Sequence, residues 1–226
     1  QMRKFDEAAV CYKDLAERFP TKSDPLYNLA EIYMRLDSTD LCLDVLDKIE
    51  ELDGVNSQLT LQKFYLMQRQ GRSEEAFEEY DKLIKRFPYD ISYRLQKGDL
   101  QMKNGQIPLA KQTYDEAAAI DPDNAYVWVA LSNYYNIVGD FETGDSLVQR
   151  ALINANLDIN TKIEILTDFL KTLLRKESKG QNLDSLNIEL PNVDALFVTI
   201  EKMHPTAPEV YDLHADYLGA IGNDSL

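Results

Sequence analysis

The chain has 226 residues, of which 44% are hydrophobic and 28% are charged, and its formal net charge is -15. This composition is typical of a folded protein, and the acidic balance argues against nucleic acid as a partner, because phosphate binding needs a basic surface. No apolar stretch approaches the roughly 20 residues of a membrane-spanning helix, so this segment is not expected to insert into a membrane.

Three series of residues recur at steps of 34 positions along the chain. The first is a series of glycines at Gly71, Gly105 and Gly139. The second series consists of turn residues, and the third consists of small residues, namely Pro20, Gly54, Pro88, Pro122 and then Ala8, Cys42, Ala76, Ala110, Gly144. Because the three series share one step and one phase, they predict an internal repeat.

Each repeat is predicted to contain two helices. Apolar residues recur three and four positions apart, and the pattern is interrupted by a glycine that suits a left-handed helix end. Asp140 is expected to begin the following helix, where acidic side chains meet the positive end of the helix dipole. The second helix is expected to stop near "RFP" or "DPDN", because proline cannot continue the helical hydrogen bonds. No stretch alternates like a strand, so the sequence predicts an all-α protein.

In chain order, residues 1–20 form a half repeat that contains only a second helix. Four complete repeats are expected to follow, and after them come an extended repeat with an insertion at about 176–191 and a half repeat with only a first helix. Their ranges are 23–56, 57–90, 91–124 and 125–158 for the complete repeats, 159–207 for the extended one and 208–226 for the last. Such units bury their apolar faces by stacking into one array.

The two ends of the array are predicted to lack a helix that covers them. Leu218 and Ile221 are expected to face outward, with no further helix to cover them. This would be an unusual exposure for a repeat array. We therefore expect either that the segment belongs to a longer repeat protein or that its ends pack against another copy.

The residues at matching positions resemble the tetratricopeptide repeat family. Trp128, Leu131, Ser132 and Tyr135 match the first half of the family pattern, and the second half is matched by Ala110, Tyr114, Ala117 and Pro122. The resemblance implies a right-handed solenoid of stacked antiparallel helix pairs, with Trp128, Leu131 and Tyr135 in its core. Phe64 and Leu166 depart from the pattern, because the family has a small residue there and this chain has Ala30, Gly98 and Ser132 in other repeats. Looser or shifted helix packing is expected in those two repeats.

The sequence offers few groups for catalysis. His214 lies between Asp212 and Asp216, but helical spacing turns it away from both, and we expect it to be a packing residue. His204 is expected to interact with the free carbonyls of a helix end. The two cysteines are expected to act as small hydrophobic residues. No zinc-protease, paired-cysteine, nucleophile-elbow or phosphate-loop motif occurs, so we predict no catalytic residue, metal, cofactor or enzymatic activity.

The resemblance implies that the first helices line a concave face whose outward side chains contact a ligand. Amides, tyrosines and charges of both signs on this face suit hydrogen bonding to an extended peptide. The predicted face consists of Tyr27, Glu31, Arg35, Gln58, Gln62, Tyr65, Arg69, Gln96, Asp99, Lys103, Tyr126, Asn133 and Asn136. One specialised form of the family clamps a peptide carboxylate, and Asn133 stands at a clamp position. Val129 replaces the lysine of that clamp, so the clamp is not expected here.

Two functions therefore follow as hypotheses. The first is a non-enzymatic scaffold that binds a protein or peptide of unknown identity. The alternative is a structural spacer or self-association module within a larger, multidomain protein, with a homo-oligomer formed through the uncapped ends. A targeting arm of a larger enzyme is a third role, and the 176–191 insertion is a second candidate site. The sequence leaves the compartment open.

Overall fold

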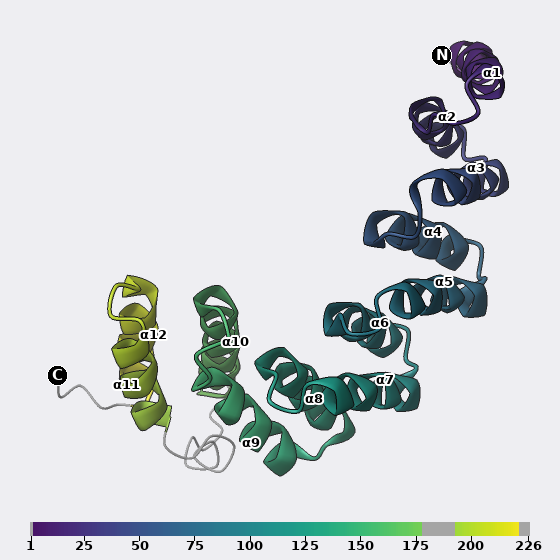
Figure 1. Ribbon diagram of the computed structural model, residues 1–226. Helices are drawn as coiled ribbons and strands as arrows, with labels where there is room; N and C mark the ends of the chain where they lie inside the picture. The colour runs from purple at the N-terminus through teal and green to yellow at the C-terminus, as the bar shows by residue number, and fades with distance from the viewer. Residues whose placement is uncertain (1, 178–192, 222–226) are drawn as a thin grey trace. The chain divides into compact units, whose positions relative to one another are not determined.

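The computed structural model describes residues 2–177 and 193–221, and helix is the only regular secondary structure within these ranges (Figure 1). None of the described helices is long and apolar enough to cross a membrane. The helices are α1 (Met2–Arg18), α2 (Asp24–Arg35), α3 (Thr39–Asp53), α4 (Ser57–Arg69), α5 (Ser73–Arg86), α6 (Ile91–Lys103), α7 (Ile107–Ile120), α8 (Ala125–Val138), α9 (Phe141–Leu152), α10 (Ile159–Glu177), α11 (Val193–Met203) and α12 (Pro208–Ala220). The expected all-α architecture is confirmed, and the helices pair as an α-solenoid. The predicted insertion falls almost wholly outside the described residues.

The chain divides into two compact units, Gln1–Tyr93 and Arg94–Leu226. In unit 1, α2 packs on α3 and α4 packs on α5, with α1 against α2. In Figure 1, the first helices α2 and α4 lie along one side of unit 1, and the second helices α1, α3 and α5 lie along the other. In unit 2, α8 packs on α9, and α12 packs on both α10 and α11.

The turns between paired helices follow the predicted glycine series. Gly71, Gly105 and Gly139 have φ angles of 75°, 73° and 86°, which a glycine adopts without strain. The equivalent turn between α2 and α3 holds Asp37, which is the only described residue other than glycine with a positive φ, at 55°. Asp37 stands 34 positions before Gly71, so it belongs to the glycine series.

Side chains at the helix starts confirm two of the expected boundaries. The Asn124 side chain accepts a hydrogen bond from the amide of Tyr126 at the start of α8. The Asp140 side chain accepts one from the amide of Thr143 at the start of α9. Each bond satisfies one of the free amides that a helix leaves at its first turn.

Trp128, the single tryptophan of the chain, is a core residue as predicted. It is 6% exposed, and its indole nitrogen donates a hydrogen bond to the carbonyl of Pro122 at 3.0 Å. The guanidinium of Arg150 lies over the ring, 3.9 Å from its centroid. The ring therefore fixes α8 against α9 and against the turn before α8.

Three expectations about packing are wrong. Leu218 is only 7% exposed, because α12 packs against both α10 and α11 and places Leu218 in a core with Phe197 and Leu170, whereas Ile221 is 40% exposed as expected. Phe64 does not loosen its repeat, since it is fully buried and its ring meets those of Phe77 and Tyr80 edge-on. Cys11 is exposed, whereas Cys42 is buried and its thiol pKa is raised to about 11 by that burial.

Candidate binding face

In unit 1, α2 carries the first stripe of predicted binding residues. Tyr27, Glu31 and Arg35 are four positions apart, so helical geometry places them on one face. The Arg35 guanidinium donates two hydrogen bonds to Glu31 Oε1, at 2.6 and 3.2 Å. The Tyr27 hydroxyl donates to Asp53 Oδ2 at 3.0 Å, and burial together with this carboxylate raises the pKa of Tyr27. All three side chains are thus engaged in contacts with other side chains of the protein, although they remain exposed.

The second stripe of unit 1 lies on α4, and its side chains form fewer contacts with other side chains. Tyr65 is exposed, and among the aromatic rings of the described residues its ring meets that of Phe64, edge-on at 5.6 Å. The amides of Gln58 and Gln62 form no hydrogen bond to any residue in the described ranges. At the end of the stripe, Arg69 pairs with Asp37 at 2.7 Å. This pair connects the end of α4 with the turn after α2, so the two stripes lie next to each other.

In unit 2, α6 carries Gln96, Asp99 and Lys103. Asp99 accepts a hydrogen bond from the buried Tyr114 hydroxyl at 2.7 Å. Burial raises the pKa of Asp99, and the bond from Tyr114 and the positive charge of Lys103 oppose this rise. Burial raises the pKa of Tyr114, and the same hydrogen bond and the charge of Asp99 raise it further. The side chains of Gln96 and Lys103 form no hydrogen bond within the described part of the chain.

The predicted residues of α8 point to different surroundings. The Tyr126 hydroxyl donates to Asp158 Oδ2 at 2.9 Å, and this bond raises the pKa of Tyr126. Asn133 is exposed, and its amide has no hydrogen-bond partner among the residues described. Asn136 turns toward α9, because its Oδ1 lies 2.3 Å from the point where a Cβ on Gly144 would stand. Asn133 is therefore the side chain of this stripe that a ligand meets most freely.

The structure gives the two histidines partners that the sequence did not reveal. His214 is a buried packing residue as predicted, and its ring stacks on Phe197 at 4.7 Å. Its ring nitrogens face Glu201 Oε1 at 2.7 Å and Asp194 Oδ1 at 3.0 Å, both on α11. The described residues hold no group of three acidic, histidine or cysteine side chains that could bind a metal.

The side chain of His204 contacts a lysine, and among the described residues it forms no hydrogen bond with a helix-end carbonyl. Its Nε2 lies 3.2 Å from Nζ of Lys162, a fully buried residue of α10. Burial and the charge of Lys162 lower the pKa of His204. Burial also lowers the pKa of Lys162, although the charge of Asp158 opposes this. A neutral His204 ring can accept a hydrogen bond from the Lys162 ammonium.

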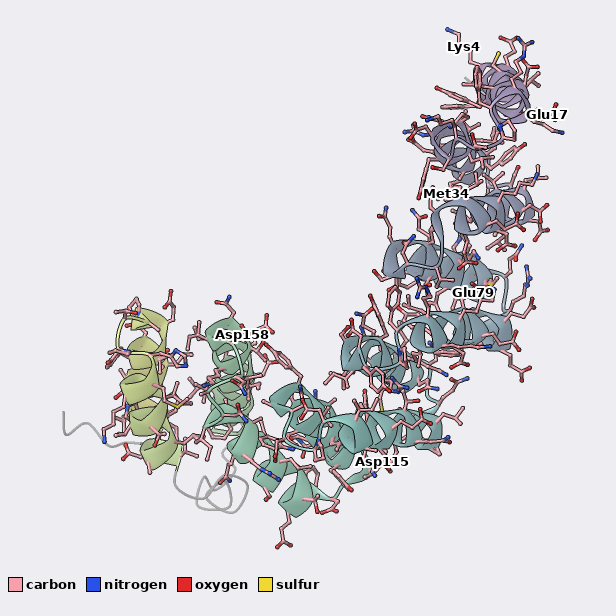
Figure 2. All side chains as sticks on the ribbon, in the orientation of Figure 1. Lys4, Glu17, Met34, Glu79, Asp115 and Asp158 are labelled. Carbon is pink, nitrogen blue, oxygen red and sulfur yellow. The ribbon has the colours of Figure 1, made fainter. Side chains whose placement is uncertain are left out.

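Sequence reasoning missed a second buried lysine, Lys63 of α4. Its Nζ lies 2.6 Å from Asp47, 2.5 Å from Glu50 and 3.2 Å from Glu79 (Figure 2 labels Glu79 on α5). Burial works to lower the pKa of Lys63, but the hydrogen bonds and charges of these carboxylates outweigh it and raise the pKa. The repeat phase could have revealed this lysine, because Lys63 falls at the position of the core residues Leu29 and Leu131.

Comparison with known proteins agrees with the helical repeat. Residues 68–134 match the family model of the tetratricopeptide repeat. The C-terminal part of a tetratricopeptide repeat-containing protein from Cytophaga hutchinsonii is 16% identical, with a TM-score of 0.55 over 98% of this chain and 85% of that one. No curated protein sequence matches the chain.

Two further solved structures are less similar. One is MamA from Desulfovibrio magneticus RS-1, with 15% identity and a TM-score of 0.44 over 89% of this chain and 94% of that one. The other is YrrB, a tetratricopeptide repeat protein with an unusual peptide-binding site, with 15% identity and a TM-score of 0.44 over 66% and 77%. The family match therefore places tetratricopeptide repeats at residues 68–134, and the chain shares its fold with the Cytophaga protein.

Proposed function

We propose that this chain is a non-enzymatic scaffold whose first helices bind an extended peptide segment of a partner protein. A role in protein interaction, in general terms, follows from the tetratricopeptide repeat. We assign the binding face and the type of ligand more narrowly, and we do so separately for unit 1 and for unit 2.

One observation carries the proposal, namely the stripe on α4 in unit 1. Gln58, Gln62 and Tyr65 lie on one helical face, and the two amides have no hydrogen-bond partner within the described ranges. A glutamine amide both donates and accepts, which matches the alternating groups of a peptide backbone. The exposed tyrosine ring adds apolar contact area at low cost in side-chain entropy. Hydrogen bonds to a backbone would bind many sequences, and Tyr65 would select among their side chains.

The neighbouring α2 stripe contributes less to such binding. The side chains of Tyr27, Glu31 and Arg35 are already engaged with Asp53 and with each other. A ligand would have to break these contacts or add to them. We therefore place the main contacts of unit 1 on α4, and those of unit 2 on the free side chains Gln96 and Asn133.

The test is a selection from a displayed library of disordered peptide segments, followed by affinity measurements on variants. Tyr65→Ala and Gln62→Ala are each expected to weaken the selected peptides by about tenfold or more, as contacts at the centre of an interface do. The matched control is Tyr89→Ala, since Tyr89 is 86% exposed in the turn after α5 and off the proposed face. Equal binding by all three variants would exclude the α4 stripe as the binding surface.

The alternative function, self-association through uncapped ends, relied on an exposed Leu218 and an exposed Ile221. Leu218 is buried within unit 2, whereas Ile221 is 40% exposed. A single exposed side chain is a smaller apolar surface than an interface between copies needs, so we do not propose this function.

A further inference from the structure

Unit 1 contains a groove of about 480 Å³ that lies apart from the α4 stripe. Its floor consists of Leu26, Leu29 and Tyr33 of α2, and its walls are the second helices α1 and α3. Leu41 and Leu52 stand on the α3 wall, and Leu41 is 49% exposed. The groove is therefore apolar at its base and open along two helices.

The repeat phase explains why the groove is open. One repeat later, Lys63 of α4 reaches Asp47 and Glu50 on α3 and Glu79 on α5, so that one side chain joins two second helices. The residues 34 positions earlier are all groove residues, namely Lys13, Ala16, Leu29 and Val45. Leucine replaces the lysine, and short apolar side chains replace both glutamates. No ion pair among the described residues then connects α1 to α3, and the groove occupies the corresponding place.

The edges of the groove carry charged side chains. Lys13 and Glu17 lie on the α1 edge (Figure 2 labels Glu17), and the α3 edge carries Asp44, Lys48 and Glu51. None of these five side chains forms an ion pair with any residue that the structure describes. A partner with charges of both signs on its flanks would match both edges.

The chemistry of the walls favours a helix as the occupant. The backbone groups along α1 and α3 are bonded within their own helices, so an extended strand would find no backbone partners there. A helix bonds its own backbone and presents apolar side chains at every third or fourth position. The wall from Leu41 to Leu52 is about 16 Å long at 1.5 Å per residue, which corresponds to about three turns of such a helix.

We propose that this groove binds an amphipathic α-helix of a partner protein. The apolar stripe of that helix lies on the floor between Leu29, Leu41 and Leu52. Its acidic flanking residues face Lys13 and Lys48, and its basic flanking residues face Glu17, Asp44 and Glu51. The site uses other side chains than the α4 stripe and does not depend on peptide binding there.

The experiment selects binders from a displayed library of helical peptides with a fixed apolar stripe and varied flanks. Binders are expected to lose about tenfold or more in affinity for Leu41→Glu, which puts a charge on the groove wall. Leu109→Glu is the matched control, because Leu109 holds the same repeat position in α7 and is 48% exposed. This control is expected to bind like the wild-type chain.

A second variant closes the groove with the ion cluster of the next repeat. It combines Lys13→Asp, Ala16→Glu, Leu29→Lys and Val45→Glu, and it is expected to bind no selected helix while keeping its helical circular dichroism. If this variant fails to fold, Leu41→Glu and Leu52→Glu still decide the question, because both positions are exposed at the groove edge. Unchanged binding by these two variants would overturn the proposal.

Two other results would also overturn it. Selected peptides without apolar residues at helical spacing would show that the occupant is not an amphipathic helix. A wild-type dimer in sedimentation that becomes monomeric in Leu41→Glu would show that a second copy of the chain fills the groove.

Discussion

Single residues in this protein depart from the repeat in ways that have energetic consequences. Asp37 occupies the turn position of the glycine series with φ at 55°, a conformation that aspartate tolerates better than most residues but less well than glycine. Its carboxylate pairs with Arg69, although both side chains are more than half exposed. Exposed pairs contribute little, typically about 0–1 kcal/mol. The turn therefore holds backbone strain that its ion pair offsets only in part.

Asp37→Gly is expected to leave the free energy of unfolding unchanged or raise it by up to about 1 kcal/mol, because relief of the strained φ outweighs the lost pair. The measurement is urea unfolding followed by far-UV circular dichroism. Arg69→Ala serves as the control, since it removes the same ion pair without changing the backbone. A clear loss of stability in Asp37→Gly would mean that the ion pair dominates.

A second residue-scale prediction concerns pH. The folded-state pKa of His204 lies below its unfolded value, so the unfolded chain takes up a proton first as the pH falls. The stability of unit 2 should therefore be fully present above about pH 6.5 and decline as the pH falls from there toward the folded-state pKa.

The variant His204→Gln keeps a hydrogen-bond acceptor facing Lys162 but cannot take up a proton. Urea unfolding at about pH 7.5 and about pH 5.5 should show a smaller loss of stability for this variant than for the wild-type chain. His214 is present in both proteins, so the difference between them reports on His204. Identical pH dependence would exclude the Lys162 contact as a cause of acid sensitivity.

At the scale of helix pairs, one small residue sets how closely the two helices of a repeat approach. A Cβ on Gly98 of α6 would stand 2.3 Å from Cε1 of Tyr114. That ring is buried and held by its hydrogen bond to Asp99, so it cannot move aside freely. In the preceding repeat, Phe64 takes the small position and meets Tyr80 edge-on at 5.6 Å. Two neighbouring repeats thus fill the same contact between their paired helices with different side chains.

Gly98→Ala is expected to destabilise the protein by about 1–3 kcal/mol, the usual cost of overpacking a core. Its control is Gly219→Ala in α12, where a new Cβ would meet nothing within 4 Å. Alanine is the better helix former, so the control should gain up to about 1 kcal/mol. Chemical denaturation of the two variants in parallel provides the comparison, and equal effects would contradict the steric argument.

At the scale of the molecule, the stability of a repeat protein depends mainly on contacts between neighbouring repeats. Lys63→Met would leave Glu50, whose side chain is 13% exposed, without its cation, whereas Glu79 would keep its ion pair with Lys82 at 2.6 Å. The expected cost is about 3–5 kcal/mol. Hydrogen exchange followed by mass spectrometry should show faster exchange in α4 and unchanged protection in α11 and α12. Loss of protection throughout the chain would instead show that the two units unfold together.

The repeat made most of the fold predictable, because glycines and prolines mark the helix ends and apolar spacing marks the buried faces. Leu218 shows where this reasoning stops. The pattern of complete repeats predicts that α12 lacks a second helix to cover its apolar face. In the structure, contacts with α10 and α11 bury that face. Such contacts depend on three-dimensional packing, which a period in the sequence does not describe.

The binding face was predictable only as stripes of residues. Helical spacing places Tyr27 with Glu31 and Gln62 with Tyr65, and it says nothing about which side chains are already occupied. Tyr27 is bonded to Asp53, far along the chain, while the Gln62 amide has no partner within the described ranges. The repeat phase could have marked Lys63 as a cation at a core position, but only the structure reveals the three carboxylates around it.

The position of Trp128 gives the protein a built-in optical probe. It is the single tryptophan, and it is buried in unit 2 against Arg150 and the turn at Pro122. Its emission therefore reports the unfolding of unit 2, while far-UV circular dichroism reports the helices of both units. Recording the two signals in one titration separates the melting of one half of the chain from that of the other without any label.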